Sequence, residues 1–265
     1  MSSAPPTWAL DEERLRRTRF SEVRLFDEVA STNDEALDEA RQGGPEGVVV
    51  VADSQTAGRG RQGRAWSARP GTALLVSVLL RPPLPVERFP LVLMAVGLAA
   101  ADGVEKAAGF RPGLKWPNDL VTGDDRKLAG VLAESAPGEE QGLVVGVGIN
   151  VSAGAYPPEL AGSAATCEEE AKCPVDRSEL LVSFLEALEG RYAPMVDAAG
   201  RDAMREVYRA CSATIGRRVR VELPGGALLE GRASHVGGNG QLVVLGDDKA
   251  YTVVSAGDVT HLHPA

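Results

Sequence analysis

GVVVVADSQTAGRGRQGRAW, residues 47–66, joins an apolar run to a loop in which glycine and arginine alternate. Residues 47–53 are rich in valine, which is typical of a short strand that is buried on both faces. Residues 58–63 then match GxGxxG, which marks dinucleotide-binding folds only where a helix starts at the loop and an acid follows about twenty positions later. Neither condition is met, because RAWSARPGT does not begin a helix cleanly and residues 82–86 contain no acid. The stretch therefore argues against the doubly wound Rossmann architecture.

The loop concentrates positive charge in an acidic chain. Arg59, Arg61 and Arg64 lie among its glycines with no acidic neighbour, although the 265-residue chain has a formal net charge of −9. Gly-Lys-Ser and Gly-Lys-Thr do not occur in the sequence, which excludes a Walker phosphate loop. An RNA-binding arginine–glycine tract would need repeats and interleaved aromatics, whereas this loop occurs once and has a single Trp66. Because exposed glycine N–H groups and guanidinium groups suit carboxylate or phosphate, we expect the loop to close on a small anionic ligand.

The remaining pattern predicts helices and strands around this loop. A cap-type Ser-Thr-Asn followed by helix formers predicts a helix over residues 31–40, and an alanine-rich apolar run predicts a buried helix over 89–108. Apolar residues on one side predict an amphipathic helix near 180–188, whereas residues 152–176 lack periodicity and are expected to form a long loop. A short helix is predicted within 11–20, and further strands at 73–80, 127–135 and 142–151.

The pattern changes near Ser212. Beyond it, short apolar segments are separated by PGG, GGNG and GDD, which are turn signals at hairpin spacing. This predicts a small β-barrel over about the last fifty residues. All three histidines, His235, His261 and His263, lie in this part of the chain. Histidine acid–base chemistry is therefore not expected in the main domain, and neither is a Ser-His-Asp triad.

Composition limits the class of protein. The negative charge argues against a general nucleic-acid binder, which usually has a basic surplus. Cys167, Cys173 and Cys211 are an odd number without CxxC spacing, so neither a zinc site nor a disulfide framework is predicted and a reducing compartment is expected. The start of the chain lacks the features of a signal peptide, and the apolar run 89–101 is too short to span a bilayer. We therefore expect a cytoplasmic protein without a nucleic-acid or membrane partner.

Polar residues beyond the loop supply groups that stabilise charge. KWPNDL places Lys115, Asn118 and Asp119 around a proline-fixed turn. Lys115 and Asp119 could form a plain surface ion pair, whereas Asn118 and Asp119 would also suit Mg²⁺ bound together with substrate phosphates. Lys127 opens a run of small and apolar residues, so it is either a strand-end gatekeeper or a ligand contact, and Asn150 is either a cap or a ribose or phosphate contact. Arginine, lysine and a metal-binding carboxylate are the groups that stabilise charge in nucleotidyl transfer.

Four motifs, in order, resemble those of biotin–protein ligases: STN (31–33), QTAGRGRQGRAW (55–66), KWPNDL with KLAGVLAE, and GVGIN (146–150). The glycine–arginine segment together with KWPND is highly specific, and the resemblance spans the chain from about Phe20. It implies an α+β fold with a central mixed β-sheet flanked by helices, similar to class II aminoacyl-tRNA synthetases, followed by a small SH3-like β-barrel. The implied domains are an N-terminal tail with a short helix (1–20), a catalytic domain (21–212) and the SH3-like barrel (213–265).

The resemblance also implies an activity. Biotin–protein ligases adenylate biotin with MgATP and pass the biotinyl group from biotinyl-5′-AMP to one lysine of the biotin carboxyl carrier domain of an acetyl-CoA or acyl-CoA carboxylase. Some members carry an N-terminal DNA-binding domain, for which the roughly twenty residues before the catalytic pattern are too few, so a monofunctional ligase is expected, as a monomer or weak homodimer. The alternatives are a lipoate– or octanoate–protein ligase on the same fold, and a non-catalytic biotin-sensing regulator, which would be expected to lack Lys127 or Asp119.

Site residues carry over from the resemblance motif by motif. Lys127 and Arg61 are the expected catalytic residues, and Asp119 is the expected Mg²⁺ ligand. Two positions depart from the family pattern: Gln62 stands where a basic residue is frequent, and AATCEE (164–169) stands where Ala-Thr-Ser is usual, which leaves the adenosine contacts of that segment open. The expected contacts of biotin and biotinyl-AMP are Ser31, Thr32, Asn33, Gln55, Gly58, Arg59, Gly60, Arg61, Lys127 and Gly130. The expected ATP contacts are Arg64, Trp66, Lys115, Asn118 and Asn150.

Overall fold

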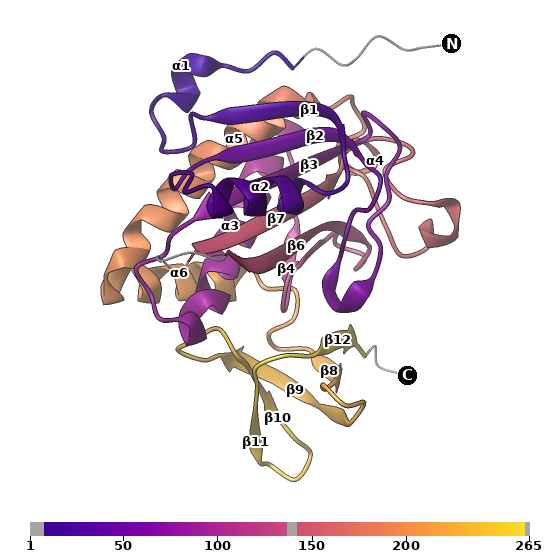
Figure 1. Cartoon of the computed structure of the whole chain (residues 1–265). Helices are drawn as coiled ribbons and strands as arrows, with labels where there is room; N and C mark the ends of the chain where they lie inside the picture. The colour runs from indigo at the N-terminus through magenta and orange to yellow at the C-terminus, as the bar shows by residue number, and fades with distance from the viewer. Residues whose placement is uncertain (1–7, 137–141, 263–265) are drawn as a thin grey trace.

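The computed structural model describes residues 8–136 and 142–262, and within these a seven-stranded sheet forms the centre of the molecule (Figure 1). The predicted tail over residues 1–7 lies outside the described residues. The strand order is β1-β2-β3-β7-β6-β5-β4, in which β1 and β2 are parallel and the other neighbours antiparallel. The predicted mixed sheet is therefore confirmed. The strands are β1 (Val23–Val29), β2 (Val49–Gln55), β3 (Ala73–Leu80), β4 (Gly113–Lys115), β5 (Asp119–Val121), β6 (Lys127–Ala136) and β7 (Gly142–Asn150).

The valine run before the glycine–arginine loop is buried on both faces of the sheet, as predicted. Successive side chains of a strand point to opposite faces. Val49 and Val51 accordingly belong to the main hydrophobic core, while Val48 and Val50 belong to a second cluster that includes Ala36 of helix α2 (Thr32–Arg41). The sheet is thus the middle layer between two sets of helices.

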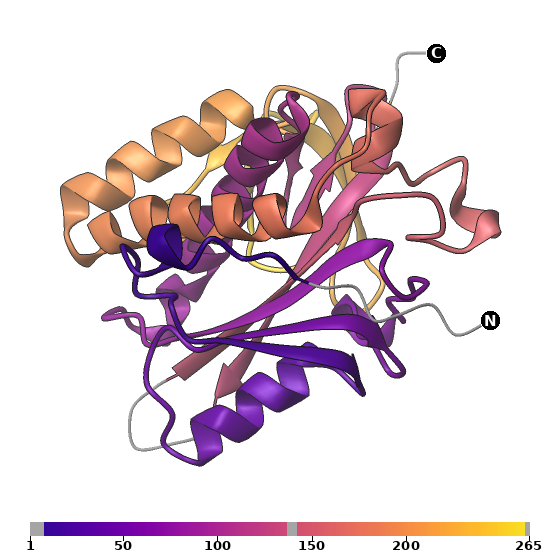
Figure 2. The same cartoon turned by 90° about the horizontal axis from the view of Figure 1, so that it is seen from above.

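Helix α3 (Phe89–Ala108) packs along α5 (Arg177–Tyr192), and both cover one face of the sheet together with α6 (Ala198–Cys211). Figure 2 shows these helices on one side of the strands and α2 on the other. A short α1 (Glu12–Leu15) contacts α5. Among the described residues, no helix combines the length and the hydrophobicity needed to cross a membrane.

Some elements were not predicted, and one loop prediction was wrong in part. Strands β1, β4 and β5 and helix α6 had no assignment from the sequence. The segment 152–176 contains a 3₁₀ turn, η3 (Pro158–Leu160), and helix α4 (Cys167–Ala171). A capping box starts α4: the Thr166 hydroxyl accepts from the Glu169 N–H at 3.2 Å, and the Glu169 carboxylate accepts from the Thr166 N–H at 3.1 Å. The other 3₁₀ turns are η1 (Arg61–Gly63), η2 (Val86–Arg88) and η4 (Ala193–Val196).

The strands after residue 212 form a separate antiparallel sheet, called here the C-terminal module. Its order is β11-β10-β9-β8-β12, which places β11 and β12 at the two ends of the order. The predicted short strands and hairpin turns are therefore confirmed. Figure 1 shows the module against the end of the central sheet at which β4 lies. The strands are β8 (Arg218–Glu222), β9 (Leu228–Val236), β10 (Leu242–Leu245), β11 (Tyr251–Val254) and β12 (Asp258–His261).

Candidate functional site

A cavity of about 610 Å³ lies between the glycine–arginine loop, strands β4 to β7 and the C-terminal module. Its volume falls in the range of about 300–1,000 Å³ that is typical of small-molecule sites. Among the described residues, the predicted contacts Gly58 and Asn150 are not part of the lining. The other predicted residues all line it: Ser31, Thr32, Asn33, Gln55, Arg59, Gly60, Arg61, Arg64, Trp66, Lys115, Asn118, Asp119, Lys127 and Gly130.

One end of the cavity is formed by the N-terminus of α2 and is neutral and polar. Gln55 Oε1 accepts from the Thr32 N–H at 2.7 Å and from the Thr32 hydroxyl at 3.1 Å. Ser77 Oγ, on β3, lies 2.8 Å from Thr32 Oγ1 and 2.6 Å from Asn33 Oδ1. Because Thr32, Asn33 and Ser77 are buried and bonded to one another, their orientation is set before a ligand enters. Ser31 is the N-cap residue of α2, but its side chain makes no capping hydrogen bond.

Glycines in β6 and β7 make room for the polar end and for an indole ring. A Cβ at Gly146 would lie 2.3 Å from Asn33 Oδ1, and one at Gly148 would lie 2.6 Å from Trp66 Cε2. Gly130 faces the same ring, because a Cβ there would lie 3.2 Å from Trp66 Cζ3. Sequence analysis used GVGIN only for its asparagine and missed these two β7 glycines. Alternate glycines in a buried strand were the available signal, because they mark a close approach of other groups.

The glycine–arginine loop folds back on itself at the cavity mouth. The Gly60 N–H donates to Arg64 O at 2.7 Å, and the Trp66 N–H donates to Gly58 O at 2.9 Å. The backbone at Trp66 approaches Gly58 closely, because a Cβ at Gly58 would lie 2.4 Å from Trp66 O. At the tip, Gln62 has a left-handed φ of 56°. The loop is an ordered hairpin that presents its arginines in different directions.

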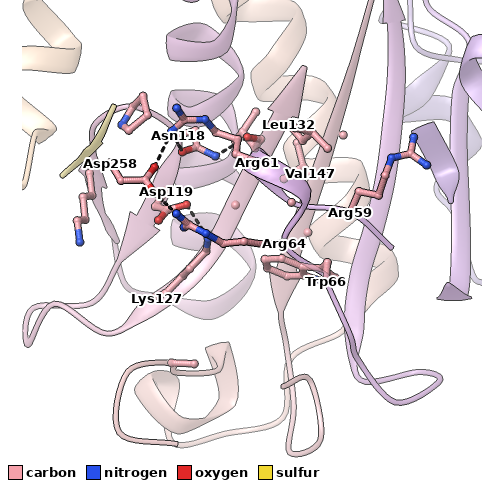
Figure 3. Close-up of a pocket in the computed structure, with 18 of the residues that line it drawn as sticks. Arg59, Arg61, Arg64, Trp66, Asn118, Asp119, Lys127, Leu132, Val147 and Asp258 are labelled. Carbon is pink, nitrogen blue, oxygen red and sulfur yellow. Dashed lines mark hydrogen bonds and ion pairs between the residues drawn. The ribbon is translucent and has the colours of Figure 1, made fainter. Parts of the chain in front are cut away.

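Arg59 points away from the other two arginines of the loop (Figure 3). Its guanidinium donates to both carboxylate oxygens of Asp34, at 2.8 and 2.6 Å, and its Nη2 lies 3.2 Å from Glu134 Oε2. The hydrogen bond from Arg59 lowers the pKa of Asp34, although partial burial opposes the shift. The positive charge of Arg59 is thus matched by two acids in this conformation. The predicted contact with the ligand carboxylate stays a prediction.

Arg61 and Arg64 are held at the cavity by the C-terminal module. Arg61 Nη1 donates to Asn118 Oδ1 at 3.1 Å, and it lies 3.4 Å from Gly257 O and 3.5 Å from Asp258 Oδ1. Arg64 forms an ion pair with Asp258. Burial lowers the pKa of Arg61, against a smaller opposing effect of Asp119. Arg61 is a half-buried guanidinium whose ion-pair partner is 3.5 Å away, and an anionic ligand would stabilise its charge.

Lys127 and Asp119 form an ion pair across neighbouring strands. Lys127 Nζ lies 2.7 Å from Asp119 Oδ1 and 5.7 Å from the centroid of the Trp66 ring. Asp119 on β5 is the register partner of Gly130 on β6, so the absent side chain of Gly130 leaves the space into which Lys127 extends. The sequence left open whether Lys127 was a gatekeeper or a site residue. The structure places its ammonium in the cavity lining.

Comparisons with known proteins agree with this geometry. Residues 25–150 match the model of the Biotin/lipoate A/B protein ligase family. The chain is 39% identical, over 96% of its length and 96% of the relative's, to a biotin--[acetyl-CoA-carboxylase] ligase of Mycobacterium tuberculosis. The chain belongs to the biotin–protein ligase family. It is also 30% identical to the bifunctional ligase/repressor BirA of Bacillus subtilis, over 93% of this chain and 78% of that protein. A solved biotin protein ligase from Aquifex aeolicus in complex with biotin and ATP has a TM-score of 0.79 at 25% identity, covering 92% of this chain and 100% of that one.

In this member of the biotin–protein ligase family, Asn150 lies outside the cavity lining and holds together two segments that form part of it. It is buried, and its Nδ2 donates to Ala165 O at 3.1 Å and to Lys127 O at 3.3 Å. The start of β6 also binds the segment before α4, because the Lys127 N–H donates to Ser163 O at 2.7 Å. Ser163 and Ala164 line the cavity. Asn150 therefore joins β6 to the segment before α4, and its predicted contact with adenosine stays a prediction.

The C-terminal module supplies part of this ligase cavity, which sequence analysis did not predict. Glu222 at the end of β8 and Asp258, Val259 and Thr260 of β12 belong to the lining. Asp258 follows Gly257 and begins a short strand, so the local pattern gave no indication of a role in the site. Its role depends on the docking of the module against the loop, which no local pattern encodes.

Proposed function

We propose that this chain is an ATP-dependent biotin–protein ligase that activates biotin as biotinyl-5′-AMP and transfers the biotinyl group to one lysine of a biotin carboxyl carrier domain. The Mycobacterium tuberculosis relative is named as a biotin--[acetyl-CoA-carboxylase] ligase, and this chain matches it over 96% of its length. The observation that carries the proposal is one cavity with a hydrogen-bonding end of uncharged side chains and a mouth at which Arg61, Arg64, Lys115 and Lys127 gather. Biotin has the same division, with a ureido group at one end and a carboxylate at the other.

The neutral end favours biotin over lipoate or octanoate. Thr32 and Asn33, held in place by Ser77, line this end and offer polar atoms that suit the N–H and C=O groups of a ureido ring. A dithiolane or an alkyl chain has no N–H or C=O group with which to form such hydrogen bonds. Sites built to hydrogen-bond a ligand discriminate strongly against analogues without the matching groups.

The arginine and lysine side chains at the cavity mouth can stabilise the negative charge of a reaction between two anions. A carboxylate oxygen of biotin attacks the α-phosphorus of ATP, and the bond to the leaving pyrophosphate breaks. We assign Lys127 and Arg61 to the carboxylate and the α-phosphate, where their charges offset repulsion between the reactants and stabilise the transition state. Lys115 and Arg64 line the same mouth and are assigned to the phosphates. In the second step the neutral amine of the acceptor lysine attacks the biotinyl carbonyl, and AMP leaves.

A magnesium ion brought in by ATP fits beside Asp119. Mg²⁺ commonly takes one or two carboxylates together with phosphate oxygens and water. Asp119 offers such a carboxylate at the mouth, and the described residues contain no group of three or more acidic, histidine or cysteine side chains that would form a complete protein cage. We therefore assign Asp119 as the protein ligand. The ion would neutralise phosphate charge there.

The domain boundary is proposed at residue 212. Residues 21–212 would form the catalytic domain and residues 213–265 an SH3-like barrel. The antiparallel order of β8 to β12 supports this division, as does a hydrophobic cluster formed mainly by residues of the module.

Exchange of labelled pyrophosphate into ATP tests the first step, and labelling of a carrier domain tests the second. We expect exchange to depend on biotin and not on lipoate or octanoate. We also expect biotin to appear on a carrier domain and not on a variant of it whose acceptor lysine is arginine. Exchange stimulated by lipoate, or no biotin-dependent exchange at all, would contradict the proposal.

A further inference from the structure

Trp116 stands in the site sequence KWPND, but its side chain belongs to the core of the C-terminal module. It is 4% exposed. The indole packs in a cluster whose other buried members are Val219, Val221, Ala233, Leu242, Val244, Val254 and Val259. Every one of these partners comes from the strands after residue 212. A side chain of the catalytic domain thus completes the core of the module.

Directed hydrogen bonds fix the indole and its backbone in this position. Trp116 Nε1 donates to Gly240 O at 3.0 Å, and the Trp116 N–H donates to Thr214 Oγ1 at 3.1 Å. The chain that enters the module runs beside β4, where the Ala213 N–H donates to Leu114 O at 2.8 Å. Trp116 is therefore held by the module through its ring, its backbone and the strand that precedes it.

The turn attached to this anchor carries groups of the site. Asn118 lies two residues after Trp116; its Oδ1 accepts from Arg61, and its Nδ2 donates to Val131 O at 2.7 Å. The next residue, Asp119, pairs with Lys127. Figure 3 shows the side chains of Asn118 and Asp119 directed toward the arginines and lysine of the cavity. A shift of the turn would move the groups that face the phosphates.

Two sets of contacts hold this turn. Strands β4 and β5 have three residues each, and β4 is the last strand in the order of the central sheet. Leu114 on β4 and Leu120 on β5 pack in the main hydrophobic core. Trp116, in the turn between the two strands, packs instead in the core of the module.

We propose that Trp116 is a positioning residue through which the C-terminal module holds Asn118 and Asp119 in place for adenylation. The inference rests on the proposed function and assigns to it a requirement for the docked module. The polar end at Ser31–Asn33 belongs to α2 and to strands on the other side of the sheet order, so it does not depend on this anchor. Loss of the anchor should therefore impair ATP activation and spare biotin recognition.

The experiment compares Trp116→Ala, Trp116→Leu and Trp116→Phe with Leu242→Ala in the full chain. Leu242 lies in the same core and is completely buried, but it is on β10, which pairs with β9 and β11. Leu242→Ala therefore weakens the module without removing the anchor. Each variant is assayed for biotin-dependent pyrophosphate exchange and, by calorimetry without ATP, for biotin binding, at a temperature where circular dichroism shows it folded.

We expect Trp116→Ala to lower kcat of exchange by roughly 10- to 100-fold, the loss that a displacement of about 1 Å can cause, with biotin affinity changed less than about twofold. Trp116→Leu should fall between it and wild type, and Trp116→Phe should recover most of the rate, because each retains more of the apolar contact. Leu242→Ala should stay near wild type. Equal losses in Trp116→Leu and Leu242→Ala, or a parallel loss of biotin binding, would overturn the inference even if Trp116→Ala does not fold. Wild type without biotin-dependent exchange would instead overturn the proposed function.

Discussion

Gly148 leaves space on β7 for the indole of Trp66, so the position of this ring in the site depends on a single glycine. A Cβ at this position would lie 2.6 Å from Trp66 Cε2 and 2.7 Å from Cζ2. The ring is rigid and packs over Gly130 of β6 and Gly148 of β7, so it has to shift as a whole when the space is taken. The loop that begins at Gly58 shifts with it, because the Trp66 N–H is bonded to Gly58 O.

Gly148→Ala should therefore weaken ligand binding while the chain still folds. Overpacking of this kind costs about 1–3 kcal/mol, which corresponds to roughly a 5- to 150-fold rise in KM for ATP. Steady-state exchange kinetics measure it. Gly190→Ala in α5 is the control, because within the described part of the chain the added Cβ would meet no heavy atom within 4 Å apart from its chain neighbours and its own helix backbone, and its KM should not change. A normal KM in Gly148→Ala would show that Trp66 has another way to pack.

Lys127→Ala should fold normally and lose adenylation. The side chain is partly exposed and contributes an ammonium to the cavity, so its removal leaves no core void. Loss of a donor to a developing phosphate charge typically costs on the order of 3 kcal/mol, roughly a hundredfold in rate. The control is Lys106→Ala, which removes an exposed lysine paired with Glu186 at 2.9 Å. Pyrophosphate exchange near the wild-type rate in Lys127→Ala would refute the assignment.

Strand β12 contacts the turn before β6 through a buried histidine, His261, whose protonation affects the stability of this contact. His261 Nε2 lies 3.1 Å from Thr214 Oγ1, and its Nδ1 lies 3.2 Å from Asp125 Oδ1 and from Arg217 Nη1. Burial lowers the pKa of His261 below its ordinary value of 6.5; Asp125 opposes the shift, and the positive charges of Lys115 and Arg217 add to it. His261 is therefore neutral in the folded protein at neutral pH.

The free energy of unfolding should fall as pH drops from about 7 to about 5.5. In that window the unfolded chain binds a proton at His261 that the folded chain does not, so acid favours unfolding; the contribution is fully present above 6.5 and is lost toward the lower folded pKa. Urea unfolding at the two pH values measures it. His261→Gln should show a smaller decrease, whereas His235→Gln, at an exposed position, should behave as wild type. An equal decrease in wild type and His261→Gln would contradict this assignment.

Over the whole molecule, the net charge of −9 disfavours binding to polyanions such as DNA. The Bacillus subtilis relative is named as both ligase and repressor, so binding to DNA is a relevant question. Affinity for duplex DNA depends on neutralisation of phosphates by lysine and arginine, and it falls where acidic groups predominate.

We expect no sequence-specific binding of duplex DNA by this chain, with or without biotin and ATP. Fluorescence anisotropy with labelled duplexes and footprinting on genomic fragments measure it, with the Bacillus subtilis protein as the positive control. A footprint that depends on biotin and ATP would contradict the expectation. Weak binding that salt abolishes and that shows no preferred sequence would not, because that is the non-specific electrostatic term.

The success of sequence analysis followed the strength of local signals. Strand β2 and helix α3 were predicted correctly because their apolar runs are continuous and their burial is almost complete. Strand β1 was missed because it lies at the sheet edge and half of its residues carry charge or face solvent. Helix α6 was missed because only Met204 and Tyr208 are buried in it. Short or half-exposed elements depend on their neighbours for stability, so their own residues carry a weak signal.

The local chemistry of this protein follows from its sequence: a loop rich in glycine and arginine after a buried strand, a polar helix start, and a lysine and a carboxylate near a proline turn. These features depend on residues close together in the chain. Tertiary structure alone decided that Arg61 and Arg64 face the cavity while Arg59 pairs with acids, and that the C-terminal module contributes Asp258 and receives Trp116. Arg61 and Gly257 are 196 residues apart, and Trp116 and Gly240 are 124 apart. Contacts at such separations arise from the docking of two folded units, so no local periodicity or spacing specifies them.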